Sequence, residues 1–253
     1  GAAGDGLPDG GDAAEHERAR ARTAIRRLAA TVALAVGPRS SWRRRAARAL
    51  AAPSLADAVA AALGVTDRQA IERALTVCAD HELNPSAFAA RVAAGTGADL
   101  YGILGAALAT WSGPRHGGAP DHLEGLLRDD LAGVRRAVAQ QRSYADGIPG
   151  FGHPLYPGGD PRAELLLAEA ARVGADRPRW TAFAAIVADL TASGCPAPNL
   201  DAGLVGLAAA LELPAGTASA VFAIGRAVGW LAHGWEQRAT GRLVRPRALY
   251  TGA

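Results

Sequence analysis

Short helical patterns, each ended by glycine or proline, fill almost all of this 253-residue sequence. Apolar residues recur at spacings of three and four, whereas the two-residue alternation of a half-buried strand is almost absent. Aromatic residues, which favour strands, make up 5% of the chain, and alanine, the strongest helix former, is abundant. The sequence therefore predicts an all-α protein, long enough for one large globular unit or two coupled lobes.

Capping residues mark several of the predicted helix boundaries. Ser54 precedes an apolar stripe that Gly64 ends, and Thr66 opens a capping-box pattern that predicts a helix to about Ala79. Asn84 followed by proline is typical of a helix start with asparagine as the N-cap. Residues 98–111 are apolar nearly all round, so we expect a buried helix there. Other helices are predicted over residues 121–141, 161–173, 180–193 and 217–237, and from residue 199 to a break at 213–214.

Charge and composition exclude some classes of partner. The formal net charge of +3 is too small to argue for nucleic-acid binding. Every basic side chain is arginine, because the sequence contains no lysine, and arginine forks suit carboxylates and phosphates. The dense basic run at residues 42–48 is expected to be a solvated helix face. Residues 1–13, rich in glycine, aspartate and proline, are interpreted as a flexible leader.

Cysteine use and hydropathy favour a cytoplasmic location. Cys78 and Cys195 form neither a metal-ligand spacing nor a disulfide framework, which fits a reducing compartment. No apolar run reaches the ~18 residues that a membrane span needs, and no signal-peptide pattern is present. We therefore expect a cytoplasmic protein with no metal site and no membrane or nucleic-acid partner.

Three histidines lie in loops, where packing alone explains them poorly. His81 stands between two predicted helices, His116 lies within a Gly-Pro-Arg-His-Gly-Gly segment, and His153 follows Pro-Gly-Phe-Gly. Loop residues flanked by glycine can approach a ligand closely. Asp201 adds a carboxylate in the first turn of a predicted helix, where an acid commonly serves only to match the helix dipole. No two of these histidines lie at a metal-ligand spacing.

Five segments together resemble the successive signature blocks of the citrate synthase family. They follow the family's order from about Cys78 to the C-terminus, roughly two thirds of the chain. The blocks read ADHELNPSAFAARVAAGTGADLY, GPRHGGAP, GFGHPLYPGGDPRA, PNLDAGL and GRAVGWLAHGWEQ…RLVRPRALY. The resemblance implies a two-lobed helical fold. Its large domain would comprise residues 14–117 and 213–253, and a smaller inserted domain at residues 118–212 would close over it.

The resemblance also implies a reaction. In the family an acyl-CoA loses an α-proton, the enol attacks the keto carbon of oxaloacetate, and the thioester is then hydrolysed. Asp201 would be the base, and burial beside apolar neighbours would have to raise its pKa from the ordinary value near 4. His116 would be a neutral donor to the thioester oxygen, and His153 would polarise the keto carbonyl.

Substrate-binding residues follow from the same resemblance. Oxaloacetate carries two carboxylates, which call for arginine forks. The matching positions are Arg162, Arg226 and Arg245, of which the last is normally donated across a dimer interface. His81 matches a further oxaloacetate-binding histidine, and Asn84 is expected to assist it. CoA would bind as a substrate, without a permanently bound cofactor, along the loop formed by Ile148, Pro149, Gly150, Phe151 and Gly152.

Departures from the family pattern leave alternatives open. Ordinary members carry a substantial N-terminal region, whereas only about eighty residues precede the His81 block here. Either a homodimer manages without that region, or another chain supplies it in a hetero-oligomer, or the sequence is a fragment. Arg115 also replaces the apolar residue usual before the loop histidine. The donor is acetyl-CoA or propionyl-CoA. The alternatives to condensation are citryl-CoA lyase-like cleavage and a non-catalytic subunit paired with a longer relative.

Overall fold

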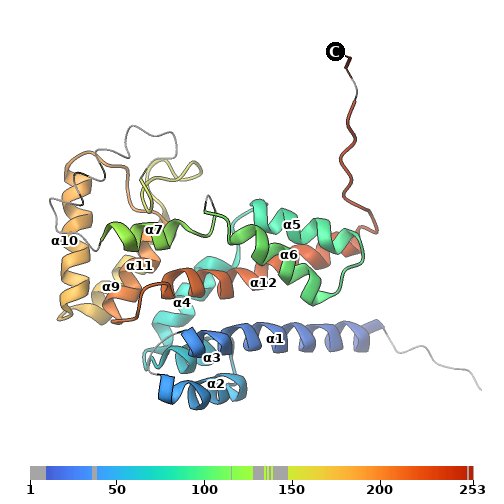
Figure 1. Ribbon diagram of the computed structural model, residues 1–253, viewed down its shortest axis with the longest axis horizontal. Helices are drawn as coiled ribbons and strands as arrows, with labels where there is room; N and C mark the ends of the chain where they lie inside the picture. The colour runs from blue at the N-terminus through green and yellow to red at the C-terminus, as the bar shows by residue number, and fades with distance from the viewer. Residues whose placement is uncertain are drawn as a thin grey trace, which may run out of the picture.

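Helix α12 (Thr217–Ala239) runs through the middle of the computed structural model, and most other helices pack around it (Figure 1). The structure describes residues 10–35, 39–114, 116–127, 134, 136, 138, 148–249 and 251–252. Within these residues there are eleven α-helices and no β-strand, so the predicted all-α fold is confirmed. In the same part of the chain, no helix is long and apolar enough to cross a membrane.

The core forms where α12 meets its neighbours. Ile224, Trp230 and Leu231 on α12 are fully buried, because the helix is apolar on nearly every side. Four helices pack against it most closely: α4 (Arg68–Ala79), α5 (Pro85–Gly95), α6 (Leu100–Trp111) and α11 (Leu200–Ala210). The last turn of α4 is thereby held against the central helix.

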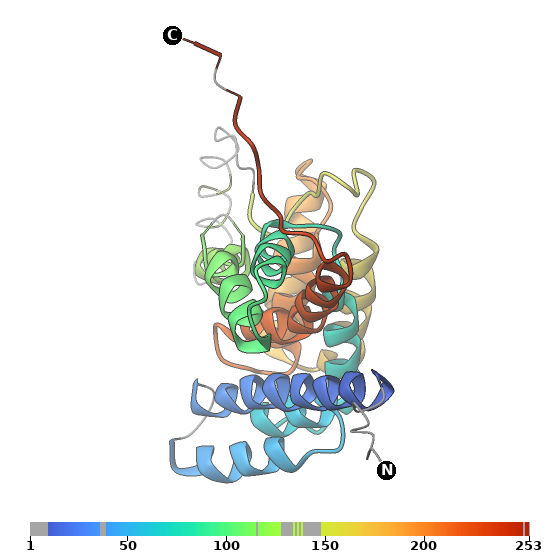
Figure 2. The same cartoon turned by 90° about the vertical axis from the view of Figure 1, so that its right-hand side faces the viewer.

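Two groups of helices flank this core. Helices α1 (Gly10–Ala35), α2 (Trp42–Ala51) and α3 (Leu55–Leu63) form a layer beneath it (Figures 1 and 2). Helices α7 (Ala119–Leu126), α9 (Pro161–Gly174) and α10 (Pro178–Ala192) pack on α11 at the other end. The predicted division into lobes at 117/118 and 212/213 stays a prediction.

Most of the predicted helix caps are present. The side chains of Ser54 and Asn84 accept backbone N–H groups of the first turns of α3 and α5, and Gly64 ends α3 with φ of 75°. The capping box predicted at Thr66 is wrong, because the N-cap of α4 is Asp67. Either residue type can cap a helix, so the pattern alone did not distinguish two adjacent candidates.

Two other expectations differ from the structure, and a third is tested only in part. Helix α1 already begins at Gly10, so residues 10–13 of the expected leader are helical. Helix α6 is buried on one face only, and Tyr101 on its other face is 49% exposed. The helix predicted over residues 121–141 is seen in part as α7, and most of its remainder lies outside the described residues, as does Arg115.

The basic run on α2 is only partly a solvated face. Arg43, Arg44 and Arg48 are exposed, as expected. Arg45 instead turns inward and donates hydrogen bonds to the carbonyls of Ala33, at 2.9 Å, and Ala62, at 2.8 Å. Its guanidinium therefore joins α2 to the ends of both α1 and α3, a role for which charge patterning gave no signal.

Two glycines let α12 approach the end of α4. A Cβ at Gly229 would lie 2.1 Å from the carbonyl oxygen of Ala79, and one at Gly225 would lie 2.7 Å from the Cβ of Cys78. Any side chain at these positions would push the two helices apart. The close approach matters for function because α4 leads directly into His81.

We expect Gly229→Ala to destabilise the protein by about 1–3 kcal/mol, because the added methyl group overlaps backbone that has no room to move. Gly105→Ala is the matched control, since that glycine lies within α6 with open space around its Cβ position. It should instead raise the free energy of unfolding by about 0.5–1 kcal/mol. Urea unfolding of both variants measures the difference, and equal effects would contradict the close-contact explanation.

Candidate active site

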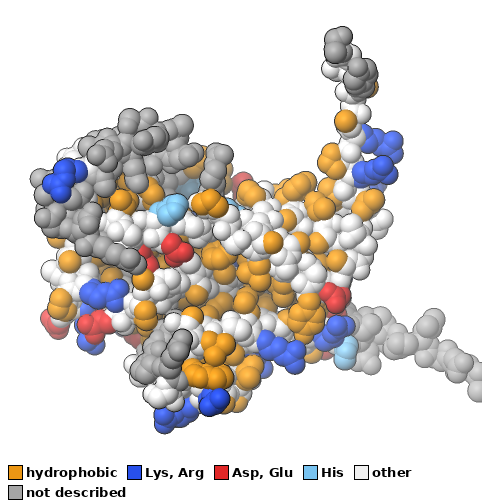
Figure 3. Space-filling view, viewed as in Figure 1, with side chains coloured by type: hydrophobic (Ala, Val, Ile, Leu, Met, Phe, Trp, Pro, Cys, Tyr) orange, Lys and Arg blue, Asp and Glu red, His pale blue; other side chains and the backbone are white. Residues whose placement is uncertain are grey.

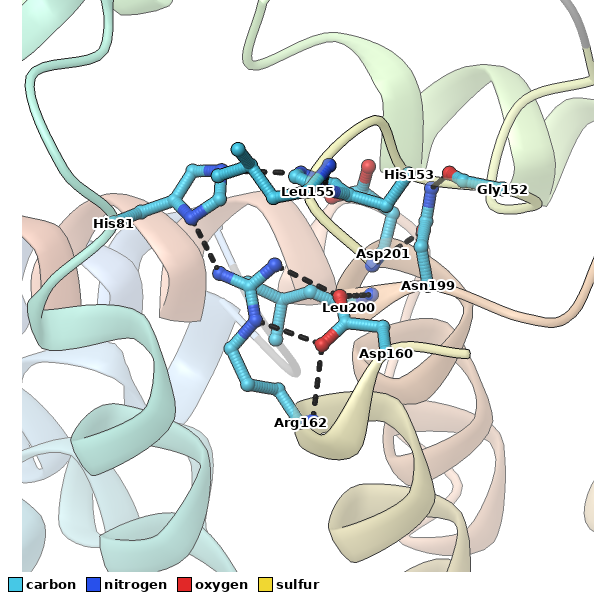
Figure 4. A network of polar contacts seen from close by, with 9 residues as sticks. All are labelled: His81, Gly152, His153, Leu155, Asp160, Arg162, Asn199, Leu200 and Asp201. Atoms are coloured by element: carbon cyan, nitrogen blue, oxygen red, sulfur yellow. Dashed lines mark hydrogen bonds and ion pairs between the residues drawn. The ribbon is translucent and has the colours of Figure 1, made fainter. Parts of the chain in front are cut away.

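Three helix ends bring the predicted polar residues together. His81 follows the last turn of α4, Arg162 lies in the first turn of α9, and Asp201 lies in the first turn of α11. His153 enters the same cluster from the loop before α9 (Figure 4). His81 thus meets His153 and Arg162, which lie 72 and 81 positions away in sequence.

A bidentate ion pair lies at the base of the cluster. Arg162 donates from Nε to Oδ1 of Asp160 at 2.9 Å and from an Nη to Oδ2 at 2.8 Å. Asp160 also caps α9 and accepts the backbone N–H of Leu200 at 3.0 Å. Burial acts to raise the pKa of Asp160, but the hydrogen bonds from Arg162 and the positive charge of its guanidinium lower that pKa overall. One carboxylate therefore fixes the start of α9, the start of α11 and the arginine (Figure 4).

The two histidines hold their N–H groups against each other. Nδ1 of His81 lies 2.9 Å from a guanidinium nitrogen of Arg162, which can only donate, so the proton of His81 is on Nε2. Nδ1 of His153 accepts the N–H of Leu155 at 3.1 Å, so its proton is on Nε2 as well. The two Nε2 atoms are 3.1 Å apart. That separation leaves no room for an atom between the two nitrogens, so a ligand atom with lone pairs would accept both N–H groups by bridging them from one side.

Both of these histidines are neutral. Burial, and then the charge of Arg162, lower the pKa of His81 to about 4. Burial and Arg162 also lower the pKa of His153, with Asp160 acting in the opposite direction. A neutral imidazole has one N–H, which is the premise of the tautomer assignment above.

Asp201 has the environment of a base. Its backbone N–H donates to the N-cap Asn199 at 3.0 Å, and no described residue forms a hydrogen bond with its carboxylate. Desolvation raises the pKa of Asp201 to about 6, although the charge of Arg162 opposes the rise. Its helical neighbours Ala202 and Leu204 are buried. Such a rise is what the role implied by the family resemblance requires of Asp201.

The glycine-rich loop at residues 148–152 positions the start of α11. The carbonyl of Gly150 accepts the backbone N–H of Asn199 at 2.9 Å, and the carbonyl of Gly152 accepts its side-chain amide at 2.9 Å. A single antiparallel bridge pairs Phe151 with Pro198. Ile148 and Phe151 are buried. Several backbone groups predicted to meet CoA are therefore already bonded within the protein, and their role in CoA binding stays a prediction.

His116 belongs to a second, adjacent network centred on Ser86. The hydroxyl of Ser86, which is fully buried, lies 2.8 Å from Nε2 of His116 and 3.0 Å from Oδ1 of Asn84. It also accepts the indole N–H of Trp230 at 2.9 Å. Burial, and then the charge of Arg226, lower the pKa of His116, so this histidine is neutral too.

Arg226 lies buried within α12, 1% exposed. Its Nε donates to the carbonyl of Cys78 at 2.7 Å, whereas one of its Nη atoms is buried without a hydrogen-bond partner among the described residues. Burial lowers its pKa to about 10, so it remains a cation at neutral pH. The amide nitrogen of Asn84 is likewise buried and unpartnered. Both are donors for a ligand that brings its own acceptors.

Arg245 is the predicted site residue that the structure leaves apart. It is exposed, in the extended segment that follows α12. That segment leaves the body of the molecule, and basic side chains are visible along it (Figure 3). This exposed position does not support a role for Arg245 in the site of its own chain.

Some residues of the site had no functional prediction. Asp160 was visible as an Asp-Pro helix start, and its proximity to Arg162 in sequence is the signal that could have found it. Ser86 and Trp230 gave no such signal, because neither spacing nor composition separates them from ordinary core residues. Among the described residues, no group of three His, Cys, Asp or Glu side chains is placed to hold a metal ion.

The family model and the similar curated sequences all indicate the citrate synthase family. The family model for the citrate synthase C-terminal domain matches residues 4–247. Putative citrate synthase 2 of Mycobacterium tuberculosis is 37% identical over 194 residues, covering 73% of this chain and 51% of that protein. Citrate synthase 2 of Bacillus subtilis is 34% identical over 189 residues, with the same coverage. The chain thus spans about half the length of the curated relatives it matches.

Solved structures agree with the sequence comparison. Citrate synthase from Thermoplasma acidophilum, in a ternary complex with carboxymethyl coenzyme A and oxaloacetate, is similar with a TM-score of 0.74 and 27% identity. The match covers 94% of this chain and 67% of that one. Citryl-CoA lyase from Hydrogenobacter thermophilus is similar with a TM-score of 0.63 and 25% identity, covering 79% of this chain and 85% of that one.

The raised pKa of Asp201 predicts that this residue limits stability at high pH. At pH 8 the folded wild-type protein must hold a desolvated carboxylate, whereas at pH 5 the carboxyl is protonated and neutral. Asp201→Asn should therefore raise the melting temperature more at pH 8 than at pH 5, where the only penalty is that of protonating a carboxyl that the unfolded chain leaves ionised. Differential scanning calorimetry at both pH values tests this, with exposed Asp176→Asn as the control. A gain of equal size at both pH values would contradict it.

Proposed function

Because the chain belongs to the citrate synthase family, we propose that it condenses an acyl-CoA with oxaloacetate and hydrolyses the resulting thioester. The observation that carries the proposal is the meeting of a base of raised pKa, Asp201, with two convergent N–H donors, His81 and His153. Carbon–carbon bond formation at a keto group needs both: a base to form the nucleophile and donors to stabilise the developing alkoxide.

The first step is removal of the α-proton of the acyl group by Asp201. A carboxylate with a pKa of about 6 is a stronger base than an ordinary aspartate, and it is still ionised at neutral pH. As the proton leaves, negative charge develops on the thioester oxygen. His116 donates an N–H to that oxygen. Its lowered pKa keeps the imidazole neutral, and a neutral imidazole is too weak an acid to protonate the enolate outright.

Ser86 holds the ring of His116 in place. Its hydroxyl donates to Oδ1 of Asn84 at 3.0 Å and lies 2.8 Å from Nε2 of His116. For His116 to serve the thioester oxygen through an Nδ1–H group, the serine proton must turn from Asn84 to Nε2 of the imidazole. Trp230 fixes the hydroxyl by donating to it from the other side.

Oxaloacetate binds through its keto oxygen and its two carboxylates. The keto oxygen bridges the Nε2–H groups of His81 and His153 from one side, so that its lone pairs accept both donors. Arg226 has a buried, unpartnered Nη, and Asn84 has an unpartnered amide; both suit a carboxylate. Arg162 supplies a further cation, already oriented by Asp160.

Two parts of the proposal concern the binding of CoA and the role of Arg245. The CoA arm would lie along the loop at residues 148–152, next to the N-cap of α11. Arg245 would act in the site of a second subunit, because its extended segment points away from its own body (Figure 2). We therefore propose a homodimer in which each subunit supplies this arginine to the other.

A second candidate function is cleavage of citryl-CoA. The share of each solved structure that this chain matches favours this activity. The match includes 85% of the Hydrogenobacter lyase but only 67% of the Thermoplasma synthase. The same base, donors and arginines would serve the reverse carbon–carbon bond cleavage. Formation of acetyl-CoA from citryl-CoA, without net condensation, would identify this activity.

Thiol release from acetyl-CoA and propionyl-CoA in the presence of oxaloacetate tests the proposed condensation. We expect turnover that rises with pH through about 6, because only the ionised Asp201 can accept the proton. Asp201→Asn should abolish it, and Ser86→Ala should lower kcat by about tenfold or more, as expected when a catalytic donor loses its orientation. The ratio of rates with the two thioesters identifies the donor. Absence of turnover with both would contradict the proposal.

Mixing two inactive variants tests the exchange of Arg245. Arg245→Ala lacks the arginine and Asp201→Asn lacks the base, so each homodimer should be inactive. In a mixed dimer, one of the two sites would contain both an intact Asp201 and the partner's Arg245. Co-expression should therefore restore about a quarter of the wild-type activity in a two-fold symmetric dimer. No recovery would show that Arg245 acts within its own chain or not at all.

A further inference from the structure

A buried ion network joins α4 and α9 at the ends of these helices that lie away from the site. Glu169 on α9 is 1% exposed, yet it forms ion pairs with two arginines. One is Arg73 on α4, and the other is Arg172, one turn further along α9. Arg172 also donates to Asp67, the N-cap of α4, at 2.7 Å.

The two helices are therefore tied together twice. At one end His81, just after α4, meets Arg162 in the first turn of α9. At the other end the network of Glu169, Arg73, Arg172 and Asp67 joins the start of α4 to the last turns of α9. The helices run antiparallel between these ties, so the spacing at one end constrains the spacing at the other.

We infer that Glu169 is a positioning residue, which sets the separation of α4 and α9 and thereby holds His81 against Arg162 and His153. The inference rests on the proposed function, since it assigns those residues to oxaloacetate binding. Seven residues separate Glu169 from Arg162 along α9, which at 1.5 Å per residue is about 10 Å. A helix transmits a shift over two turns with little loss, so no contact with substrate is required.

The charge of Glu169 favours this role over simple packing. A carboxylate with almost no exposure is costly to bury unless it is paired, and its two arginine partners are themselves exposed. Its partner Arg73 forms no other described hydrogen bond or ion pair. A pair of apolar side chains would have filled the same space between the helices, but without fixing one direction and distance.

Glu169→Gln and Arg73→Gln test the inference together. Both remove the ion pair between Glu169 and Arg73 and leave only Arg172 and Asp67 to join these ends of α4 and α9. Both should therefore raise KM for oxaloacetate by about tenfold with a smaller change in kcat, as expected for coupling through a shared element. The double variant should be no worse than either single variant. Exposed Glu164→Gln, on the same helix, is the control and should leave KM unchanged.

Hydrogen exchange provides a second readout that does not depend on activity. In Glu169→Gln and Arg73→Gln, amides of residues 80–83 and 153–162 should exchange faster than in Glu164→Gln, while those of α2 and α3 stay the same. Unchanged exchange and unchanged KM, with only a lower melting temperature, would overturn the inference. If the wild-type chain shows no turnover, the proposed function fails, and exchange alone decides the role of Glu169. If Glu169→Gln does not fold, Arg73→Gln decides it.

Discussion

The ion pair between Asp160 and Arg162 is the interaction on which the candidate site depends. Asp160 caps the helix that carries Arg162, orients the guanidinium through two hydrogen bonds and accepts the N–H of Leu200 at the start of α11. Arg162 then determines the tautomer of His81, and its charge influences both His81 and Asp201. Removing one carboxylate would therefore loosen two helix ends and change the protonation of the site.

The helical architecture was largely predictable because its signals are local. Asn84, Ser54 and Gly64 cap helices through their own side chains or their own backbone conformation, which neighbouring sequence reveals. The prediction failed where distant packing decides the outcome. Arg45 looked like part of a solvated run, but the free carbonyls at the ends of α1 and α3 draw it inward. Burial of only one face of α6 likewise depends on which helices lie beside it.

The site was predictable to the extent that its residues form motifs. His81, His153, Arg162 and Asp201 were named from sequence blocks, and the structure brings them together. The hydrogen-bond directions could not be predicted, because each depends on a partner from another block. Ser86 illustrates this limit. Its hydroxyl contacts Trp230, 144 residues away, and His116, and neither contact can be read from the sequence around Ser86.

The facing N–H groups of His81 and His153 imply a form of chemical selectivity that shape alone would not provide. A 2-oxo acid presents lone pairs at this point, whereas the 2-amino acid with the same carbon skeleton presents an ammonium group, which has only hydrogens to offer. Donors would then face donors in a partly buried space, and the mismatch penalises the amino acid even though it fits the same volume. If the proposed 2-oxo acid binds here, the two ring nitrogens would separate keto acids from amino acids by the direction of their hydrogen bonds.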